Sequence, residues 1–244
     1  MKRPRQKLLF NLILIVIIFL GLIFITGSSL RTLKTLDYFK LKDIIVKETA
    51  SGDLSYLKGR NIFSINLKEE SRYAAQLYPD YKKVRLIRIL PNRLFVDFIR
   101  RRPLAYIKLY RYFCVDEDAV LFDMSESEKE DLPVILGLDT KIFGPKTGQK
   151  YNIKELATSL DIIKEVQKNK ILKDYKIKKI DVVSLSNTSF FTASGLEIKL
   201  GQDNIKDKIN ILSGLLPQVK NDLGNIKYID LRFKEPLIKL NDAK

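Results

Sequence analysis

The sequence predicts an α+β protein that a single N-terminal helix holds in a membrane. Three observations lead to this prediction. An uncharged apolar run lies near the N-terminus, helical and strand-like hydrophobic periods alternate through the rest of the chain, and the side chains that many enzymes use are missing. With 244 residues, the chain is long enough for an anchor and two modest domains.

The apolar run covers residues 8–25 and contains no charged residue. As a helix it spans about 27 Å, close to the hydrocarbon thickness of a bilayer. A cleaved secretory signal is the competing interpretation, but the apolar core of a signal is usually only about 7–15 residues long. The predicted membrane helix covers residues 8–26, with the anchor residues Leu8, Ile15, Phe19 and Ile25.

The basic residues beside this run predict its orientation. Lys2, Arg3, Arg5 and Lys7 precede it with no acidic residue among them. Because Lys and Arg next to a membrane helix stay in the cytoplasm, residues 1–7 form a cytoplasmic tail and the chain from residue 27 onward is exported. This placement in the cytoplasmic (inner) membrane, as a single-pass protein, argues against nucleic acid as a partner.

Residues 27–40 are expected to be a linker, and residues 41–109 a small domain of β-α-β-β type. A short strand at 44–46 precedes a helix that Asn66 caps and Pro79 ends. Two strand-like runs at 83–90 and 93–99 then pair as a hairpin. Four residues are expected to share one face of this helix at helical spacing: Leu67, Ala74, Leu77 and Tyr78.

Residues 110–244 are expected to form a larger mixed α/β domain with a mainly antiparallel sheet. Two amphipathic helices begin at the predicted caps Asn152 and Asn204. The final strand-like run, 237–240, follows Pro236 and is expected to lie at a sheet edge, where free backbone groups can pair with another chain. The other predicted strands cover residues 112–115, 119–122, 177–183, 189–192, 196–200 and 226–233.

The composition argues against catalysis. The chain has no histidine and one cysteine, Cys114, so neither a zinc site nor a triad with an imidazole base can be assembled. We therefore predict no enzyme activity, no catalytic or metal-ligating residues, no cofactor and no small-molecule substrate. The formal net charge of +15 favours anionic contacts, and Arg100, Arg101 and Arg102 are read as either a solvated strand end or a contact with headgroups or an acidic partner.

Several short motifs, in order, resemble those of the FtsQ/DivIB family of bacterial cell-division proteins. In the first domain the matching residues are Gly59, Asn61, Ile62 and Phe63; Val84, Arg88, Pro91 and Leu94; and Arg101, Pro103 and Ala105. In the second domain they are Val115, Asp116, Val120 and Phe122; Leu132, Pro133 and Gly137; Gly195, Leu196, Leu200, Gly201 and Lys208; and Ile229, Asp230, Leu231, Arg232 and Phe233.

The resemblance implies a cytoplasmic tail, a membrane helix, a POTRA domain and an FtsQ-type β domain. It implies a scaffold of the divisome, concentrated at the division septum, that binds an FtsB/FtsL-like (DivIC-like) complex and other divisome proteins and helps place and regulate septal peptidoglycan synthesis. Membrane lipid would contact the anchor. The partner-binding residues that it implies are Phe233, Lys234, Pro236, Leu237, Ile238 and Lys239.

Two departures and two alternatives accompany this resemblance. Arg100 stands where the family usually has Glu, and Ala119 stands where it usually has Gly, which predicts an altered turn. A POTRA-bearing membrane protein of an export or assembly system is one alternative, and an extracytoplasmic enzyme that acts on the cell wall is another. The first usually carries several such domains before a β-barrel, and the second requires a pocket with perturbed carboxylates or an activated serine.

Overall fold

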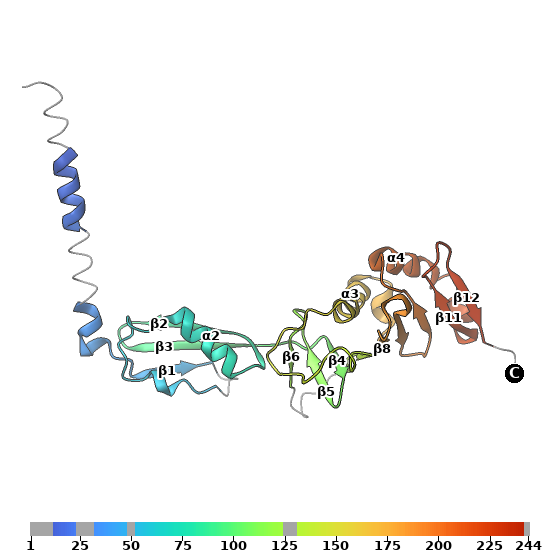
Figure 1. Cartoon of the computed structure of the whole chain (residues 1–244), viewed down its shortest axis with the longest axis horizontal. Helices are drawn as coiled ribbons and strands as arrows, with labels where there is room; N and C mark the ends of the chain where they lie inside the picture. Colours follow the sequence, from blue (N-terminus) through green and yellow to red (C-terminus); the bar gives the residue numbers. More distant parts are fainter. Residues whose placement is uncertain (1–11, 23–31, 48–51, 124–130, 242–244) are drawn as a thin grey trace, which may run out of the picture. The chain divides into compact units, whose positions relative to one another are not determined.

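The computed structural model describes residues 12–22, 32–47, 52–123 and 131–241 (Figure 1). The chain divides into two compact units, Met1–Ile99 and Arg100–Lys244. Each unit has its own sheet and its own hydrophobic core, so each is described by itself.

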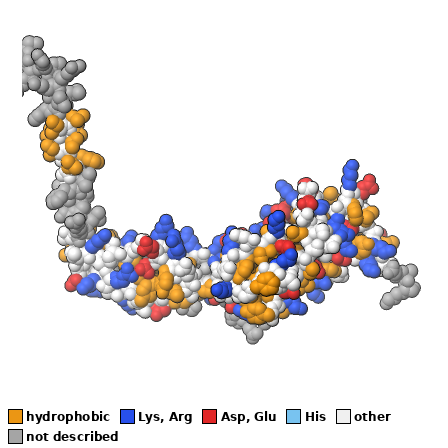
Figure 2. Space-filling model, in the orientation of Figure 1, with side chains coloured by type: hydrophobic (Ala, Val, Ile, Leu, Met, Phe, Trp, Pro, Cys, Tyr) orange, Lys and Arg blue, Asp and Glu red, His pale blue; other side chains and the backbone are white. Residues whose placement is uncertain are grey.

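The N-terminal part of the first unit contains a helix over residues 12–22. Its side chains are mostly hydrophobic and exposed, as Figure 2 shows, and Ile15 and Phe19 are 65% and 62% accessible. Leu8 and Ile25 lie outside the described residues. Among the helices that the structure describes, none has both the length and the apolar character required to cross a bilayer.

The first unit has the β-α-β-β order that the sequence predicts. Strand β1 (Asp43–Val46) pairs in parallel with β3 (Arg93–Arg100), and β2 (Tyr81–Ile89) flanks β3 on its other side. Helix α2 (Leu67–Leu77) packs against β2. The unit also contains the short 3-10 helices η1 (Asp37–Phe39) and η2 (Ser55–Leu57).

Helix α2 begins as predicted, but the residues expected to share one face differ in burial. The Asn66 side chain accepts hydrogen bonds from the backbone N–H groups of Lys68 (3.2 Å) and Glu69 (3.4 Å), so Asn66 is its N-cap. Ala74 is the fully buried residue of this helix, whereas Leu77, which was expected to share its face, is 48% accessible. A helix on a three-stranded sheet makes contact along a narrow stripe, and Leu77 lies about 100° around the axis from Tyr78.

The second unit is built on one mixed sheet with the strand order β12-β11-β10-β9-β8-β7-β4-β5-β6. Its strands are β4 (Ala105–Lys108), β5 (Tyr112–Val115), β6 (Leu121–Phe122), β7 (Val134–Leu136), β8 (Ile177–Asp181), β9 (Ser189–Thr192), β10 (Glu197–Lys199), β11 (Ile226–Asp230) and β12 (Leu237–Leu240). Its helices are α3 (Lys154–Lys168) and α4 (Ile205–Leu215), with 3-10 helices η4 (Leu172–Asp174), η5 (Leu185–Asn187) and η6 (Lys220–Asn225).

Most neighbouring strand pairs in this sheet are antiparallel, as predicted, and two helices serve as crossovers between parallel strands. Strands β7 and β8 are parallel and α3 connects them, and β10 and β11 are parallel and α4 connects them. Since parallel neighbours need such a crossover, two amphipathic helices in this region are a sign of parallel pairs. A third parallel pair joins β4 to β7.

The predicted helix caps of this unit were wrong. Helix α3 starts after Ile153 rather than after Asn152, and no side chain caps it. Asn204 precedes α4, but it adopts a left-handed conformation with φ of 52° and makes no capping hydrogen bond. A capping side chain normally requires extended backbone angles at the cap position, which Asn204 does not have.

Strand β4 places the division between the units earlier than the predicted boundary at 109/110. Residues Ala105–Lys108 pair with β5 on one side and β7 on the other, so they belong to the nine-stranded sheet. The first unit ends at Ile99 and the second begins at Arg100. The alternation in β4 is too short to be recognised without its partners.

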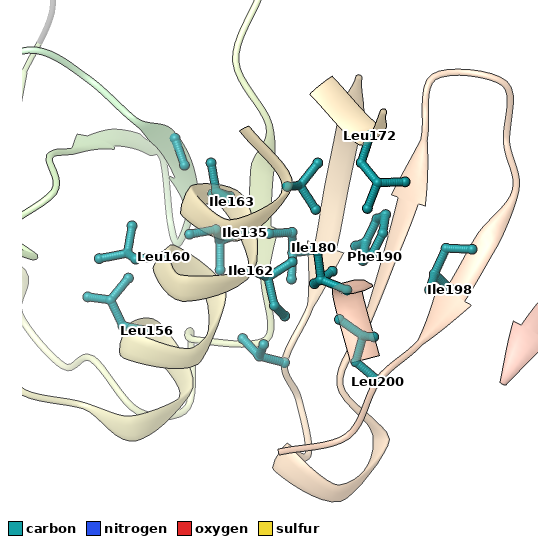
Figure 3. Packing of buried hydrophobic residues seen from close by; sticks show 14 of the residues in the cluster. Ile135, Leu156, Leu160, Ile162, Ile163, Leu172, Ile180, Phe190, Ile198 and Leu200 are labelled. Carbon is teal, nitrogen blue, oxygen red and sulfur yellow. The ribbon is translucent and has the colours of Figure 1, made fainter. Parts of the chain in front are cut away.

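A row of apolar side chains runs across this sheet beneath the helices. Cross-strand pairing joins, in order, Phe113, Ile107, Ile135, Ile180, Phe190, Ile198, Ile229 and Ile238. Figure 3 shows Ile135 and Ile180 beside Ile162 and Ile163 of α3, with Phe190 and then Ile198 farther from that helix. The members up to Ile229 are buried, and Ile238 on β12 is 39% accessible. The core therefore reaches the edge of the sheet without closing over it.

Gly137 follows β7 with φ of 89°, a conformation that side chains disfavour. A Cβ at this position would overlap the backbone nitrogen of Val183. We expect Gly137→Ala to lower the free energy of unfolding by about 2 kcal/mol or more, because strain and a backbone clash add. Chemical denaturation of the purified chain measures this change.

Gly214→Ala is the matched control. Nothing lies within 4 Å of the Cβ position at Gly214, which is inside α4. The control is expected to gain about 0.5–1 kcal/mol from helix propensity. Equal effects of the two substitutions would contradict the close approach of Gly137 to Val183.

Candidate functional site

The candidate site is β12, the end strand of the nine-stranded sheet. It pairs antiparallel with β11 on one side, and no other described strand pairs with its outer side. About half of the N–H and C=O groups of an edge strand point away from the sheet, so they are available to a further strand. All four of its residues are exposed.

The register with β11 assigns the side chains of β12 to two faces. Ile238 and Leu240 lie opposite Ile229 and Ile226, which are buried on the helix-covered face. Leu237 and Lys239 lie opposite Asp230 and Tyr228, on the other face. The edge therefore presents two apolar residues that continue the core, and a mixed pair on the opposite face.

A register shift between Ile226 and Tyr228 interrupts the pairing near the end of β12. Such a bulge places one extra residue, here Lys227, in β11. The pairing resumes beyond the bulge, since the backbone N–H of Asn241 donates to the carbonyl oxygen of Asn225 (2.7 Å). The regularly paired length that β12 offers is accordingly short.

The turn before β12 exposes the remaining predicted partner-binding residues. Phe233, Lys234 and Pro236 are all exposed, and the Phe233 ring is 59% accessible. The Arg232 guanidinium carbon lies 5.8 Å from the centroid of that ring. The six predicted residues therefore form one continuous exposed segment, comprising the turn and the edge strand.

An ion pair between Asp230 and Arg232 fixes the start of this turn. The Arg232 nitrogens donate to the Asp230 carboxylate at 2.6–3.2 Å, and Arg232 Nη1 also donates to Asn187 Oδ1 at 2.5 Å. The Asp230 side chain is only 5% accessible. Hydrogen bonding to Arg232 holds the pKa of the Asp230 carboxyl below its ordinary value of 3.8.

Two other motif residues in the second unit also make structural contacts. Arg101 Nη1 bonds Asp116 Oδ2 at 2.5 Å, and Asp116 Oδ1 accepts from the backbone N–H groups of Asp118 and Val120. Of the basic run at 100–102, Arg101 is therefore part of a mostly buried ion pair, not of a solvated strand end or a free contact surface. In the turn after Asp116, Ala119 has φ of 62°, so alanine occupies a left-handed conformation that glycine favours.

The motif residues of the first unit fix its loops in the same way. Arg88 Nε and Nη2 donate to the carbonyl oxygens of Ile62 (2.9 Å) and Ile65 (2.7 Å). The Asn61 side chain donates to the Leu33 carbonyl oxygen and accepts from the Phe63 N–H. Arg88 thus connects two motifs that lie far apart in the sequence.

The predicted set missed Leu240. This residue is 57% accessible and shares the helix-covered face with Ile238. Continued alternation along the predicted strand 237–240 was the signal that would have included it. The anchor residues Ile15 and Phe19 are located on the helix over residues 12–22, away from this segment in the sequence.

Comparisons with known proteins assign the chain to a class. Residues 105–232 match the family described as "Cell division protein FtsQ/DivIB, C-terminal". The chain is 26% identical over 221 residues to the "Cell division protein FtsQ" of Syntrophotalea carbinolica, covering 85% of this chain and 76% of that protein. It is 24% identical over 221 residues to the protein of that name from Geotalea daltonii, covering 88% and 77%.

The fold and these similarities define a cell division protein. More particularly, the chain belongs to the FtsQ/DivIB family, since the matching family region covers more than half of it. The matched region contains β4 to β11 and ends at Arg232, just before the exposed turn and β12.

The Asp230–Arg232 pair makes stability depend on pH. A carboxyl with a lowered folded-state pKa contributes stability above its ordinary pKa of 3.8, and this contribution disappears as pH falls further. We expect Asp230→Asn to lower the free energy of unfolding by about 2–4 kcal/mol at neutral pH. The difference from the unsubstituted protein should shrink at pH values below 3.8, as measured by denaturant titration at a series of pH values.

Asp123→Asn is the control for this prediction. Asp123 pairs with Arg111 at 2.6 Å, but both side chains are nearly half exposed. An exposed pair contributes about 1 kcal/mol or less, so this substitution should have a small effect at every pH. A pH-independent loss in Asp230→Asn would mean that the carboxylate charge does not stabilise the turn.

Proposed function

We propose that the chain is a membrane-anchored, non-catalytic scaffold of the bacterial divisome. In this proposal it binds an FtsB/FtsL-like (DivIC-like) complex through β12 and the preceding turn, contacts other divisome proteins, and helps place and regulate septal peptidoglycan synthesis. The observation that carries the proposal is the exposed apolar edge strand in a protein of the FtsQ/DivIB family.

Strand addition is the proposed mode of binding. Backbone groups on the outer side of β12 supply hydrogen bonds, and the side chains on alternating faces select the partner. Phe233, Leu237, Ile238 and Leu240 add apolar surface that water now covers. Lys234 and Lys239 add positive charge at the same edge, which favours a partner strand with acidic residues.

The first unit is proposed to be a POTRA domain, and the apolar run at 8–26 to be its membrane anchor. The β-α-β-β order and the three-stranded sheet support the first proposal. The uncharged apolar run with basic residues before it supports the second, with the N-terminus in the cytoplasm and both units outside. Recruitment to the septum follows from the divisome role. No specific observation favours an export or assembly protein or a cell-wall enzyme.

The interface is tested by replacing Phe233 and Leu237 together with glutamate. We expect recovery of an FtsB/FtsL-like complex with the full-length chain to fall by more than about tenfold, because two exposed apolar contacts are lost and charge is introduced. Affinity purification from detergent-solubilised membranes measures the recovery. In cells that carry only this variant, we expect unseptated filaments or chains.

The matched control replaces Phe143 and Ile211 with glutamate. These residues are 81% and 46% accessible and lie outside the turn and β12. The control should keep full recovery and normal septation. Amide hydrogen exchange tests whether the partner binds by strand addition. A strand that pairs with β12 should slow the exchange of backbone amides in residues 237–240. Undiminished recovery in the first variant would refute the interface.

The anchor is tested by replacing four residues of the N-terminal helix with lysine: Leu12, Ile15, Phe19 and Leu22. Each lysine near the centre of a membrane helix costs about 2.5–3.5 kcal/mol of insertion free energy, so we expect the variant to leave the carbonate-washed membrane fraction. A variant with leucine at residues 15 and 19 should stay in that fraction. Retention of the lysine variant at the unsubstituted level would exclude this segment as the anchor.

A further inference from the structure

A second concave surface lies in the second unit, at the ends of the strands and beside the end of α3. A cavity of about 390 Å³ opens there, between the C-terminal half of α3, the segment before β7, the start of β8 and the turn after β9. An adjoining cavity of about 420 Å³ shares Tyr175, Lys176 and Ala193 with it. In the sheet, β7 and β8 are separated from β12 by β9, β10 and β11, so this groove is not the edge-strand site.

The rim of the groove is basic. Lys173, Lys176 and Lys178 line it and are exposed, and the acidic residue that lines the first cavity is Asp131. Asp131 pairs with Lys176 at 3.4 Å, but their side chains are 87% and 72% accessible, so this pair is weak. Asp174 lines the adjoining cavity, so three lysines and two aspartates line the two cavities together, and a small excess of positive charge remains.

The floor of the groove is apolar. Ile163 and Val166 of α3 belong to the buried core, and Ile177 and Tyr175 are partly buried against it. Figure 3 shows Ile163 on the side of α3 that faces the sheet. Lys168, in the last turn of α3, pairs with Glu165 at 2.9 Å and is not part of the lining.

We propose that this groove is a second protein-binding site, which takes an acidic segment of a partner and receives one bulky apolar side chain of that segment. Charge complementarity identifies the partner, because lysines around a concave apolar floor attract carboxylates that flank an apolar side chain. The site goes beyond the proposed function, since neither β12 nor the turn before it contributes to the groove.

The shape of the site favours a protein segment over a lipid surface. A membrane surface is broad and nearly flat, and clustered basic residues are attracted to it by the potential of its anionic headgroups. Here the lysines surround a cavity of about 390 Å³, which falls within the range that binds small groups. An apolar side chain with its flanking residues can enter such a cavity, whereas a flat bilayer surface cannot.

The test uses the full-length chain in detergent and a set of short fluorescent peptides in which glutamates surround one phenylalanine, leucine or tyrosine. Fluorescence anisotropy measures the dissociation constant. We expect saturable binding by the unsubstituted chain that weakens as ionic strength rises. We expect Lys173→Glu with Lys178→Glu to weaken binding by more than about tenfold, because like charges then oppose the peptide.

A second variant tests the contribution of the apolar floor to binding, independently of the charge of the lysines. Ala193 is exposed and lines the groove, so Ala193→Trp takes up part of the cavity without a change of charge. It should weaken binding by about tenfold, as should replacement of the aromatic or aliphatic residue of the peptide by serine.

The controls have the same charge or volume change elsewhere. Lys146→Glu with Lys206→Glu alters two exposed lysines outside the groove, and Ala157→Trp enlarges an exposed residue of α3 outside it. Both should bind the peptides as the unsubstituted chain does, and so should the Phe233 and Leu237 glutamate variant. This last result separates the groove from the edge-strand proposal.

Three results would overturn the groove proposal. The first is no saturable peptide binding by the unsubstituted chain. The second is an equal loss in the groove variants and their controls, which would indicate only nonspecific attraction. The third is that vesicles of phosphatidylglycerol, but not the peptides, bind in a way that depends on Lys173 and Lys178, which would assign the lysines to a lipid surface.

Discussion

The second unit depends on the uninterrupted apolar row that crosses its sheet from Phe113 to Ile238. Each cross-strand pair in this row positions the next strand, because a slip of one residue would turn the row toward the opposite face. Burial of each large aliphatic member contributes about 1.5–3 kcal/mol, so the register is strongly fixed. The row continues onto β12, but the residue that continues it there, Ile238, is not buried. Strand β12 is therefore an apolar edge strand that is fixed in register and exposed to water.

The residues that carry the resemblance to the family largely explain the fold and not the binding. Arg88 bonds the carbonyl oxygens of Ile62 and Ile65, Arg101 bonds Asp116, and Lys208 Nζ donates to the Leu200 carbonyl oxygen at 2.7 Å. Each of these long side chains satisfies backbone or carboxylate groups that loops would otherwise leave without partners. Apart from Phe233, which belongs to both sets, the proposed interfaces consist mainly of exposed aliphatic and lysine side chains outside these motifs.

The sequence predicted the elements with strong periodicity and missed those that tertiary contacts define. The run 237–240 coincides with β12, and Asn66 caps α2 as expected. Strands β4 and β7 were not predicted, because segments of three or four residues are too short to show a strand-like hydrophobic period on their own. The Asn204 cap failed because its backbone is left-handed, a conformation that residue type alone does not determine. The edge position of β12 was predicted, whereas the basic groove joins segments that only the fold brings together.

The shortness of β12 has a consequence for how tightly a partner needs to bind. Four residues with a bulge opposite one end supply only a few main-chain hydrogen bonds, each of which contributes about 0.5–1.5 kcal/mol. Binding between free molecules would then be modest. If the partner lies in the same bilayer as the proposed anchor of this chain, diffusion in two dimensions raises their effective concentration, and a weak contact becomes sufficient. Assembly would then respond to crowding at one place in the membrane and reverse when the chains disperse.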